Sequence, residues 1–301
     1  MTNKTIQFLI IAILSVYLFY GIDIKEIDFR IFNIWGVVLT ILALSISQIL
    51  LAVRWIVMSK LSFKISLETI VVSSALNMLL PARLGEASKA FYLKKFYNFN
   101  YHKTISIIFI ERFFDIVMLF LLMCFSAYLY FTNDTLKNSI IFFSILILLV
   151  IVFFNSKKAY TLIKKIPVKF ARVYTQKIYK NINRLLKNPY QTLFITLLIW
   201  LFYLISNTLF FRYGVSYHLS FQDSLELFIF FTIALSIPLT PAGIGTFEGA
   251  IVLFLTHHGV NKTDALISAT LYHLLIFGVD FVMLYIFLIT KNIKLKELIK
   301  K

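Results

Sequence analysis

The stretch that decides the fold is residues 225–258, LELFIFFTIALSIPLTPAGIGTFEGAIVLFLTHH. Apolar residues fill both ends of this stretch, and Pro238, Pro241, Gly243 and Gly245 interrupt its middle. Proline removes a helical hydrogen bond, and glycine adopts backbone angles that other residues avoid. The pattern therefore predicts two apolar helices joined by irregular backbone. Such backbone survives at membrane depth only where protein buries it or where it lines a wet cavity.

The whole chain has the composition of a membrane protein. Of its 301 residues, 60% are hydrophobic and 15% are charged, where soluble domains have about 45–50% and about 25%. The 30 Lys and Arg residues outnumber the 14 Asp and Glu residues, and they gather in blocks between apolar runs, as in proteins that face an anionic inner leaflet. These features exclude an ordinary soluble domain. The single cysteine, Cys124, excludes a disulfide framework and a Cys-rich metal site.

Six apolar runs are candidates to cross a bilayer, which takes about 20 residues; they are approximately 5–20, 33–58, 105–131, 139–155, 191–212 and 264–290. Lys and Arg mark the cytoplasmic side. Both flanks of the further apolar stretch 66–81 are basic, whereas neither flank of 225–258 is. We therefore expect an all-α polytopic membrane protein with six transmembrane helices and two re-entrant broken helices of opposite orientation. It forms a single transmembrane domain over residues 1–301, with both termini in the cytoplasm.

The loop at about 156–190 is the most basic part of the chain. Its Lys and Arg residues alternate with apolar residues such as Ile163, Phe170 and Ile182, and it contains no acid. This pattern predicts an amphipathic helix on the anionic cytoplasmic leaflet. Tyr174 and Tyr179 are too few for a surface that stacks nucleic-acid bases, so we expect no nucleic-acid partner.

The two predicted breaks have similar sequences. The first reads Pro81-Ala82-Arg83-Leu84-Gly85-Glu86, and the second also has Pro-Ala, then glycine, then a glutamate that opens a helix. Broken helices of opposite orientation are typical of transporters built from inverted repeats. The alternative is that both are ordinary turn-to-helix junctions, and the order of elements in the two halves is not an obvious inversion.

Three segments carry a family resemblance: Asn77-x-x-x-Pro81-x-Arg83-x-Gly85-Glu86-x-x-Lys89-Ala90-x-x-Leu93, Glu111-Arg112-x-x-Asp115 and Pro238-x-x-Pro241-Ala242-Gly243-Ile244-Gly245-Thr246-Phe247-Glu248. Together they resemble the signature segments of the lysylphosphatidylglycerol synthase transmembrane family, from the second span to the last. The resemblance implies a flippase-like membrane domain in its stand-alone form. Because the chain stops at Lys301 without the aminoacyl-transferase domain of the fused forms, it implies lipid translocation or handling, not aminoacyl-lipid synthesis. One departure is His273, near where the family often has an arginine.

The first segment offers candidates for a phosphate site. Arg83 could grip two phosphate oxygens with its planar fork, and Lys89 could add a compact charge. A helix that begins near Gly85 would add free N–H groups, and Glu86 in its first turn would cap it or pair with Arg83 or Arg112. The resemblance adds Asn77 to these candidates. The alternative for Arg83 and Lys89 is that they only anchor the topology, as most juxtamembrane basic residues do.

The second segment places two acids on one helix face. Glu111 and Asp115 are four residues apart, so their charges repel unless a cation joins them or one carboxyl is protonated. Arg54 or Arg83 could supply that cation, and Arg112 lies on an adjacent face. The cluster is then either a proton or counter-ion site, or an ion-pair lock that holds helices together.

The third segment is rich in glycine. Pro241, Gly243 and Gly245 favour a turn that a ligand or another helix can approach closely. Thr246 would cap the following helix, freed amides would receive a phosphate, and Glu248 would receive a cation or an amine. The alternative is a packing turn whose glycines let helices touch.

The remaining polar residues suggest less. His273 and Asp280 are seven residues apart on one face of the last span, where they form a proton relay or a hydrogen-bonded helix contact. His257 and His258 lack further spaced ligands, so we expect no metal and no cofactor.

The sequence thus predicts a lipid transporter that translocates or handles an anionic-headgroup phospholipid or a polyprenyl-phosphate-linked lipid. Arg83 and Lys89 receive the headgroup, while Glu111, Asp115 and Glu248 supply charge compensation or proton coupling. One alternative is an intramembrane enzyme that acts on a lipid phosphate. Another is a non-catalytic membrane subunit of a lipid-modifying or glycosyltransferase system. Membrane lipids are the expected partners, with a lipid-modifying enzyme or a second copy of the chain as further ones. The frequent Ile, Lys, Asn and Phe residues suggest a bacterial inner membrane.

Overall fold

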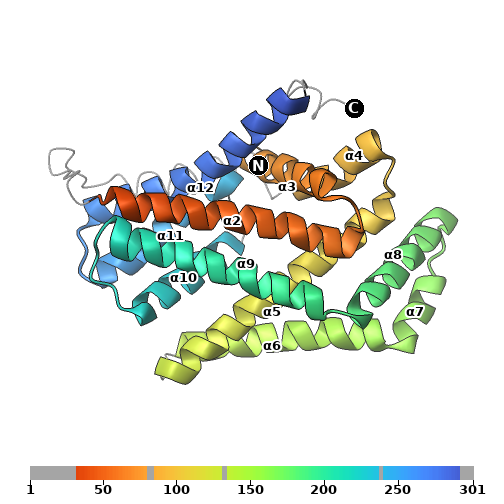
Figure 1. The fold of residues 1–301 in the computed structure, drawn as a ribbon. Coiled ribbons are helices and arrows are strands. Elements are labelled where there is room, and N and C mark those ends of the chain that lie inside the picture. The colour runs from red at the N-terminus through yellow and green to blue at the C-terminus, as the bar shows by residue number, and fades with distance from the viewer. Residues whose placement is uncertain (1–31, 80–84, 131–133, 237–239, 292–301) are drawn as a thin grey trace, which may run out of the picture. The chain divides into compact units, whose positions relative to one another are not determined.

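The computed structural model describes residues 32–79, 85–130, 134–236 and 240–291 (Figure 1). Within these residues every regular element is a helix and there is no strand, so the prediction of an all-α membrane protein is confirmed. The elements are α2 (Ile34–Ser59), α3 (Phe63–Leu79), α4 (Gly85–Tyr97), α5 (Tyr101–Tyr130), α6 (Asp134–Asn155), α7 (Lys157–Lys164), α8 (Lys169–Lys187), α9 (Tyr190–Thr208), the π-helix η4 (Leu209–Gly214), α10 (Phe221–Ser236), the 3-10 turn η5 (Pro241–Gly243), α11 (Thr246–His257) and α12 (Lys262–Lys291).

In the described part of the chain, three helical segments are long and apolar enough to cross a membrane: Ile34–Ser59, Tyr190–Gly214 and Lys262–Lys291. They match the predicted spans 33–58, 191–212 and 264–290. At about 1.5 Å per residue, each exceeds the roughly 30 Å thickness of the hydrocarbon core.

Two further predicted spans are also helical. The span 105–131 is the 30-residue helix α5. The span 139–155 lies in α6, whose residues Ile140–Phe154 make an angle of 67° with Lys158–Lys164 of α7. The predicted first span, 5–20, lies outside the described residues. The count of six spans and the orientation of the termini therefore stay predictions.

The chain divides into two compact units. Unit 1 lies within Met1–Gln48, Val71–Glu86 and Leu201–Lys301, and unit 2 within Ile49–Ile70 and Ala87–Trp200. The single transmembrane domain expected over the whole length stays a prediction.

Within unit 1, α11 packs against both α10 and α12 (Figure 1). Because α10 and α11 pack together, the chain turns back on itself between Ser236 and Thr246, which is where the sequence predicts a break. Stacked rings fill the core of this unit, with Tyr272 lying 5.0 Å from Phe210 and 6.0 Å from Phe247 between ring centroids. The broken helix is therefore confirmed, while its return to one side of a membrane stays a prediction.

Two glycines bring the start of α2 against the end of η4. The amide N of Asn33 donates to the carbonyl O of Gly214 at 2.7 Å. A Cβ atom added to Gly36 would lie 2.5 Å from the backbone N of Gly214, so no larger residue fits there without a shift. Small residues allow this kind of backbone contact between membrane helices.

Within unit 2, α5 packs against α6 and α8, and α7 packs against α8. Helix α8 buries Tyr179 and Ile182, and the ring of Tyr179 stacks on Phe154 and Tyr160. Phe170 of the same helix is 78% exposed. The predicted amphipathic loop contains the helices α7 and α8, while its role as an amphipathic element on a leaflet stays a prediction.

Candidate functional site

Arg54 of α2 joins the two carboxylates of α5. Its side chain is fully buried; Nη1 lies 2.7 Å from Oδ1 of Asp115, and Nη2 lies 3.2 Å from Oε1 of Glu111. Nη1 also donates to Oγ1 of Thr196 in α9 at 3.3 Å. Of the two arginines that the sequence offered as a bridge, the structure places Arg54 there.

Lys89 of α4 occupies the other oxygen of Glu111. Its Nζ lies 2.7 Å from Oε2 of Glu111, and both side chains are buried. The same ammonium group lies 4.8 Å from the ring centroid of Trp55. Each oxygen of Glu111 therefore faces a cation, which offsets the cost of removing this carboxylate from water.

Arg112 completes a group that we call the charge cluster: Arg54, Lys89, Glu111, Arg112 and Asp115. Nη2 of Arg112 lies 3.1 Å from Oδ2 of Asp115, and its side chain is 38% exposed, the highest fraction in the cluster. Asp115 also accepts a hydrogen bond from Nε1 of Trp200 at 3.3 Å. Arg54, Lys89 and Arg112 thus surround the carboxylates of Glu111 and Asp115, and Arg112 is the cation of the charge cluster that is most open to an approaching anion.

Gly85 begins α4, as the sequence predicts, and it lies in unit 1 with Asn77 and Ser73. A Cβ atom at Gly85 would be 2.3 Å from the backbone N of Asn77 and 2.5 Å from the carbonyl O of Ser73. Glu86 lies in the first turn of α4, where the helix dipole stabilises a carboxylate. Within the described residues, Oδ1 of Asn77 is buried without a hydrogen-bond partner. Arg83, the predicted phosphate ligand, lies outside the described residues.

The second glycine-rich segment forms a turn that Glu248 closes. Gly243 and Gly245 have positive φ angles of 78° and 83°, which suit glycine. The amide N of Gly245 donates to Oε2 of Glu248 at 2.7 Å. Oε1 of Glu248 lies 2.6 Å from Nδ1 of His273 in α12. Both oxygens of Glu248 are therefore engaged inside the protein, by a backbone amide and by a histidine.

The prediction that Thr246 caps α11 is wrong by one residue. Gly245 occupies the cap position and Thr246 is the first helical residue. The hydroxyl of Thr246 donates back to the carbonyl O of Gly243 at 2.8 Å. The cap shifts because the carboxylate of Glu248, three residues later, already satisfies the amide of Gly245. Pro241 opens the short turn η5 before it.

His273 and Asp280 contact different partners. While His273 meets Glu248, Asp280 accepts a hydrogen bond at 2.7 Å from Nε2 of Gln48 in α2. This arrangement matches the predicted helix contact and gives no direct relay between the two. The sequence analysis did not identify Gln48, although a polar residue in the middle of an apolar span is a signal for such a contact.

A third polar group, which the sequence analysis missed, surrounds Glu68 of α3. The hydroxyl of Tyr92 donates to Oε2 of Glu68 at 2.9 Å, and the hydroxyl of Tyr97 donates to the same oxygen. Burial and the neighbouring Glu68 raise the pKa of Tyr92 above its ordinary value, so this hydroxyl stays a donor. In the described ranges, no group of three or more His, Cys, Asp and Glu side chains could hold a metal ion.

The fold and the buried charges define an all-α integral membrane protein with ionic groups between its helices. The chain belongs to the family of the lysylphosphatidylglycerol synthase TM region, whose model matches residues 5–283. It is also similar to the UPF0104 membrane protein MJ1078 of Methanocaldococcus jannaschii. The two are 29% identical over 216 residues, which cover 66% of this chain and 87% of that protein. No solved structure matches the chain.

Proposed function

We propose that the protein binds membrane lipids with anionic headgroups and moves them between leaflets. Membership of the family supports a lipid-related role. The apolar helices indicate that the protein is surrounded by lipid. The charge cluster adds ionisable side chains, which are rare in such helices. Charged side chains within membrane segments are costly, and they commonly mark a substrate path.

The observation that carries the proposal is the partly exposed guanidinium of Arg112 at the edge of the charge cluster. Glu111 is saturated by Arg54 and Lys89, whereas the partly exposed Arg112 contacts Asp115. Arginine can hold two phosphate oxygens at once with its planar fork. A lipid phosphate that approaches Arg112 would therefore compete with Asp115 for this guanidinium.

The other predicted ligands have defined parts in this proposal. Arg83 contacts the headgroup, while Lys89 acts from within the charge cluster because Glu111 holds its ammonium group. The start of α4, near Gly85, adds the positive end of a helix dipole to the path. In unit 1, the carboxylate of Glu248, paired with His273, compensates positive charge that accompanies the lipid. We place the protein in a bacterial inner membrane with both termini in the cytoplasm.

The test is leaflet exchange by the purified protein in vesicles of phosphatidylcholine and phosphatidylglycerol. A fluorescent phosphatidylglycerol is bleached from outside with dithionite, which does not cross the bilayer. We expect protein-dependent bleaching of the inner-leaflet probe, and mass spectrometry should recover the lipid unaltered. Arg112→Gln should slow exchange at least tenfold, while Arg172→Gln on α8, a matched loss of one positive charge, should not.

Two results would contradict the proposal. Exchange no faster than in protein-free vesicles would exclude translocation of this lipid class. Recovery of chemically altered lipid would instead indicate an enzyme that acts on the lipid phosphate.

A further inference from the structure

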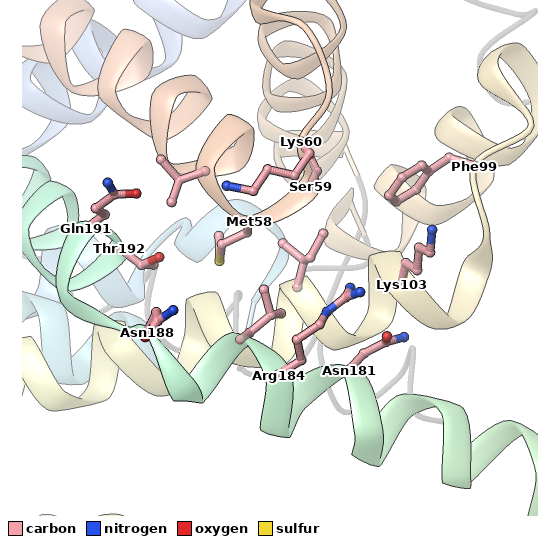
Figure 2. Close-up of a pocket in the computed structure, with 13 residues that line it drawn as sticks. Met58, Ser59, Lys60, Phe99, Lys103, Asn181, Arg184, Asn188, Gln191 and Thr192 are labelled. Atoms are coloured by element: carbon pink, nitrogen blue, oxygen red, sulfur yellow. The ribbon is translucent and has the colours of Figure 1, made fainter.

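A cavity of about 510 Å³ lies within unit 2 (Figure 2). Its walls come from the end of α2, the start of α5, the last turns of α8 and the first turn of α9. The volume is within the usual range of roughly 300–1,000 Å³ for small-molecule sites. Apolar side chains such as Met58 and Ile107 form part of the lining.

The charged side chains that line the cavity are all basic. Lys60, Lys103 and Arg184 line it, and no acidic residue does. Across the described parts of the chain, no ion pair is found for any of these three residues. Figure 2 shows the charged ends of Lys60 and Arg184 in the space between the end of α2 and α8. Three unneutralised cations around one cavity favour an anionic occupant.

Uncharged donors surround the same space. Nδ2 of Asn181 is buried and has no hydrogen-bond partner among the described residues, although a buried amide donor normally finds an acceptor. The first turn of α9 contributes Gln191 and Thr192, so the positive end of a 19-residue helix opens on the cavity. A phosphate oxygen would satisfy the amide of Asn181.

A chain of hydrogen bonds links the cavity wall to the charge cluster. Oγ1 of Thr196 donates to the carbonyl O of Thr192 at 2.7 Å, and Nη1 of Arg54 donates to Oγ1 of Thr196 at 3.3 Å. Thr192 lines the cavity, and Arg54 bridges Glu111 and Asp115. The hydroxyl of Thr196 therefore joins Thr192 of the cavity wall to Arg54 of the charge cluster.

We propose that this cavity is the entry site for the phosphate of an anionic lipid headgroup, held by Lys60, Lys103, Arg184 and Asn181. The assignment deepens the proposed function and rests on it, because it names where the transported lipid first binds. From a headgroup bound here, Thr192 and Thr196 lead to Arg54 of the charge cluster. The charge cluster is the second site on the proposed path. The surrounding segments are the basic ones that the positive-inside rule places in the cytoplasm, so entry is from the cytoplasmic leaflet.

The experiment measures binding by calorimetry on the full-length protein in a zwitterionic detergent. Three probes are used: dihexanoyl phosphatidylglycerol, glycerol 1-phosphate, and dihexanoyl phosphatidylcholine. We expect phosphatidylglycerol to bind at least tenfold more tightly than the other two. Glycerol 1-phosphate lacks the acyl chains that contact the apolar lining, and the choline cation is repelled by the three basic residues.

The variants isolate the cavity from general charge effects. Lys60→Gln/Arg184→Gln should weaken phosphatidylglycerol binding at least tenfold. Lys64→Gln/Lys180→Gln removes the same charge from exposed residues that do not line the cavity, so its binding should stay within twofold of wild type. Asn181→Asp keeps the size of the side chain and places a negative charge in the cavity, so it should also lose binding. Melting temperatures near that of wild type confirm that each variant is folded.

The outcomes separate this proposal from the proposed function. Wild-type affinity in Lys60→Gln/Arg184→Gln overturns the cavity assignment, even when the protein exchanges lipid between leaflets. Equal affinity for glycerol 1-phosphate and phosphatidylglycerol overturns the lipid assignment in favour of a free phosphate. Selective loss of lipid binding in the cavity variants supports the site, even when the vesicle assay shows no translocation and the proposed function fails.

Discussion

The ammonium group of Lys89 in α4 lies 2.7 Å from Oε2 of Glu111 in α5, and both side chains are buried. The sequence suggested Lys89 as a headgroup ligand, and the structure gives its charge a partner. A lipid phosphate that binds Lys89 directly has to replace Glu111, which then leaves a buried carboxylate with Arg54 alone. Arg112, at 38% exposure, is therefore the more accessible cation of the charge cluster.

Replacing Lys89 with Met should destabilise the protein. The change leaves Glu111 with one of its two cations, and breaking a buried ion pair costs about 3–5 kcal/mol. We expect a loss near the lower end of that range because Arg54 remains, measured as a lower melting temperature in detergent. The double variant Lys89→Met/Glu111→Gln should recover part of the loss. Unchanged melting of the single variant would show that this pair contributes nothing to stability.

Gly85→Ala should disturb the contact between α3 and α4. The new methyl group would lie 2.3 Å from the backbone N of Asn77, and overpacking of this kind costs about 1–3 kcal/mol. Gly278→Ala is the matched control, because among the described residues no atom beyond its chain neighbours and the nearby backbone of α12 lies within 4 Å of its Cβ position. That variant should gain up to about 1 kcal/mol from helix propensity. Equal melting temperatures for the two variants would contradict the close contact at Gly85.

Glu248→Ala and Glu248→Gln separate two roles of Glu248: the hydrogen bond that it accepts from the Gly245 amide and the negative charge of its carboxylate. Alanine removes the acceptor of the Gly245 amide, and the loss of such a cap costs about 0.5–2 kcal/mol. Glutamine keeps an acceptor oxygen, so it should melt near wild type while exchanging lipid more slowly because the negative charge is gone. If the glutamine variant exchanges lipid at the wild-type rate in vesicles, Glu248 is a structural cap and compensates no charge.

Arg83→Lys tests a residue that the sequence singles out as a phosphate ligand. The change keeps the charge and therefore the orientation, since Lys and Arg count alike in the positive-inside rule. A hydrogen bond to a charged group is worth about 1.5–3 kcal/mol, so loss of the arginine fork should slow exchange about ten- to a hundred-fold. Arg83→Gln should be slower still. Exchange by Arg83→Lys at the wild-type rate would identify Arg83 as a topological anchor.

Cysteine labelling tests the predicted topology in a Cys124→Ser background. Asn98 and Val173 are exposed, as is His218. Cysteines at Asn98 and Val173 should react with a membrane-impermeant maleimide only from the cytoplasmic side, and a cysteine at His218 only from outside. Labelling of positions 173 and 218 from the same side would contradict the six-span arrangement.

The helices were predictable where one physical signal dominates. Long apolar runs predicted α2, α9 with η4, and α12. Alternating basic and apolar residues predicted α8. Proline and glycine marked the break before α11. The cap of that helix was misplaced by one residue because Thr246 is a good capping residue by type. Only the fold shows that Glu248 reaches the Gly245 amide.

The partners of the buried charges were less predictable. The spacing of Glu111 and Asp115 indicates that a cation must join them, but Arg54 is 57 residues from Glu111 in sequence. Gln48 and Asp280 are 232 residues apart. Pairing over such distances depends on which helices pack together, and one sequence does not specify this. The cavity is a similar case, because the sequence shows its basic residues but not that they surround one space.

The contact between Gly36 and Gly214 has a consequence for biosynthesis. Gly36 belongs to a helix that is made early, whereas its partner follows about 180 residues later, roughly ten to forty seconds at about 5–20 residues per second. During that interval the surface of α2 around Gly36 has no glycine partner to meet. The start of α2 therefore cannot make its contact with Gly214 until the end of η4 leaves the ribosome.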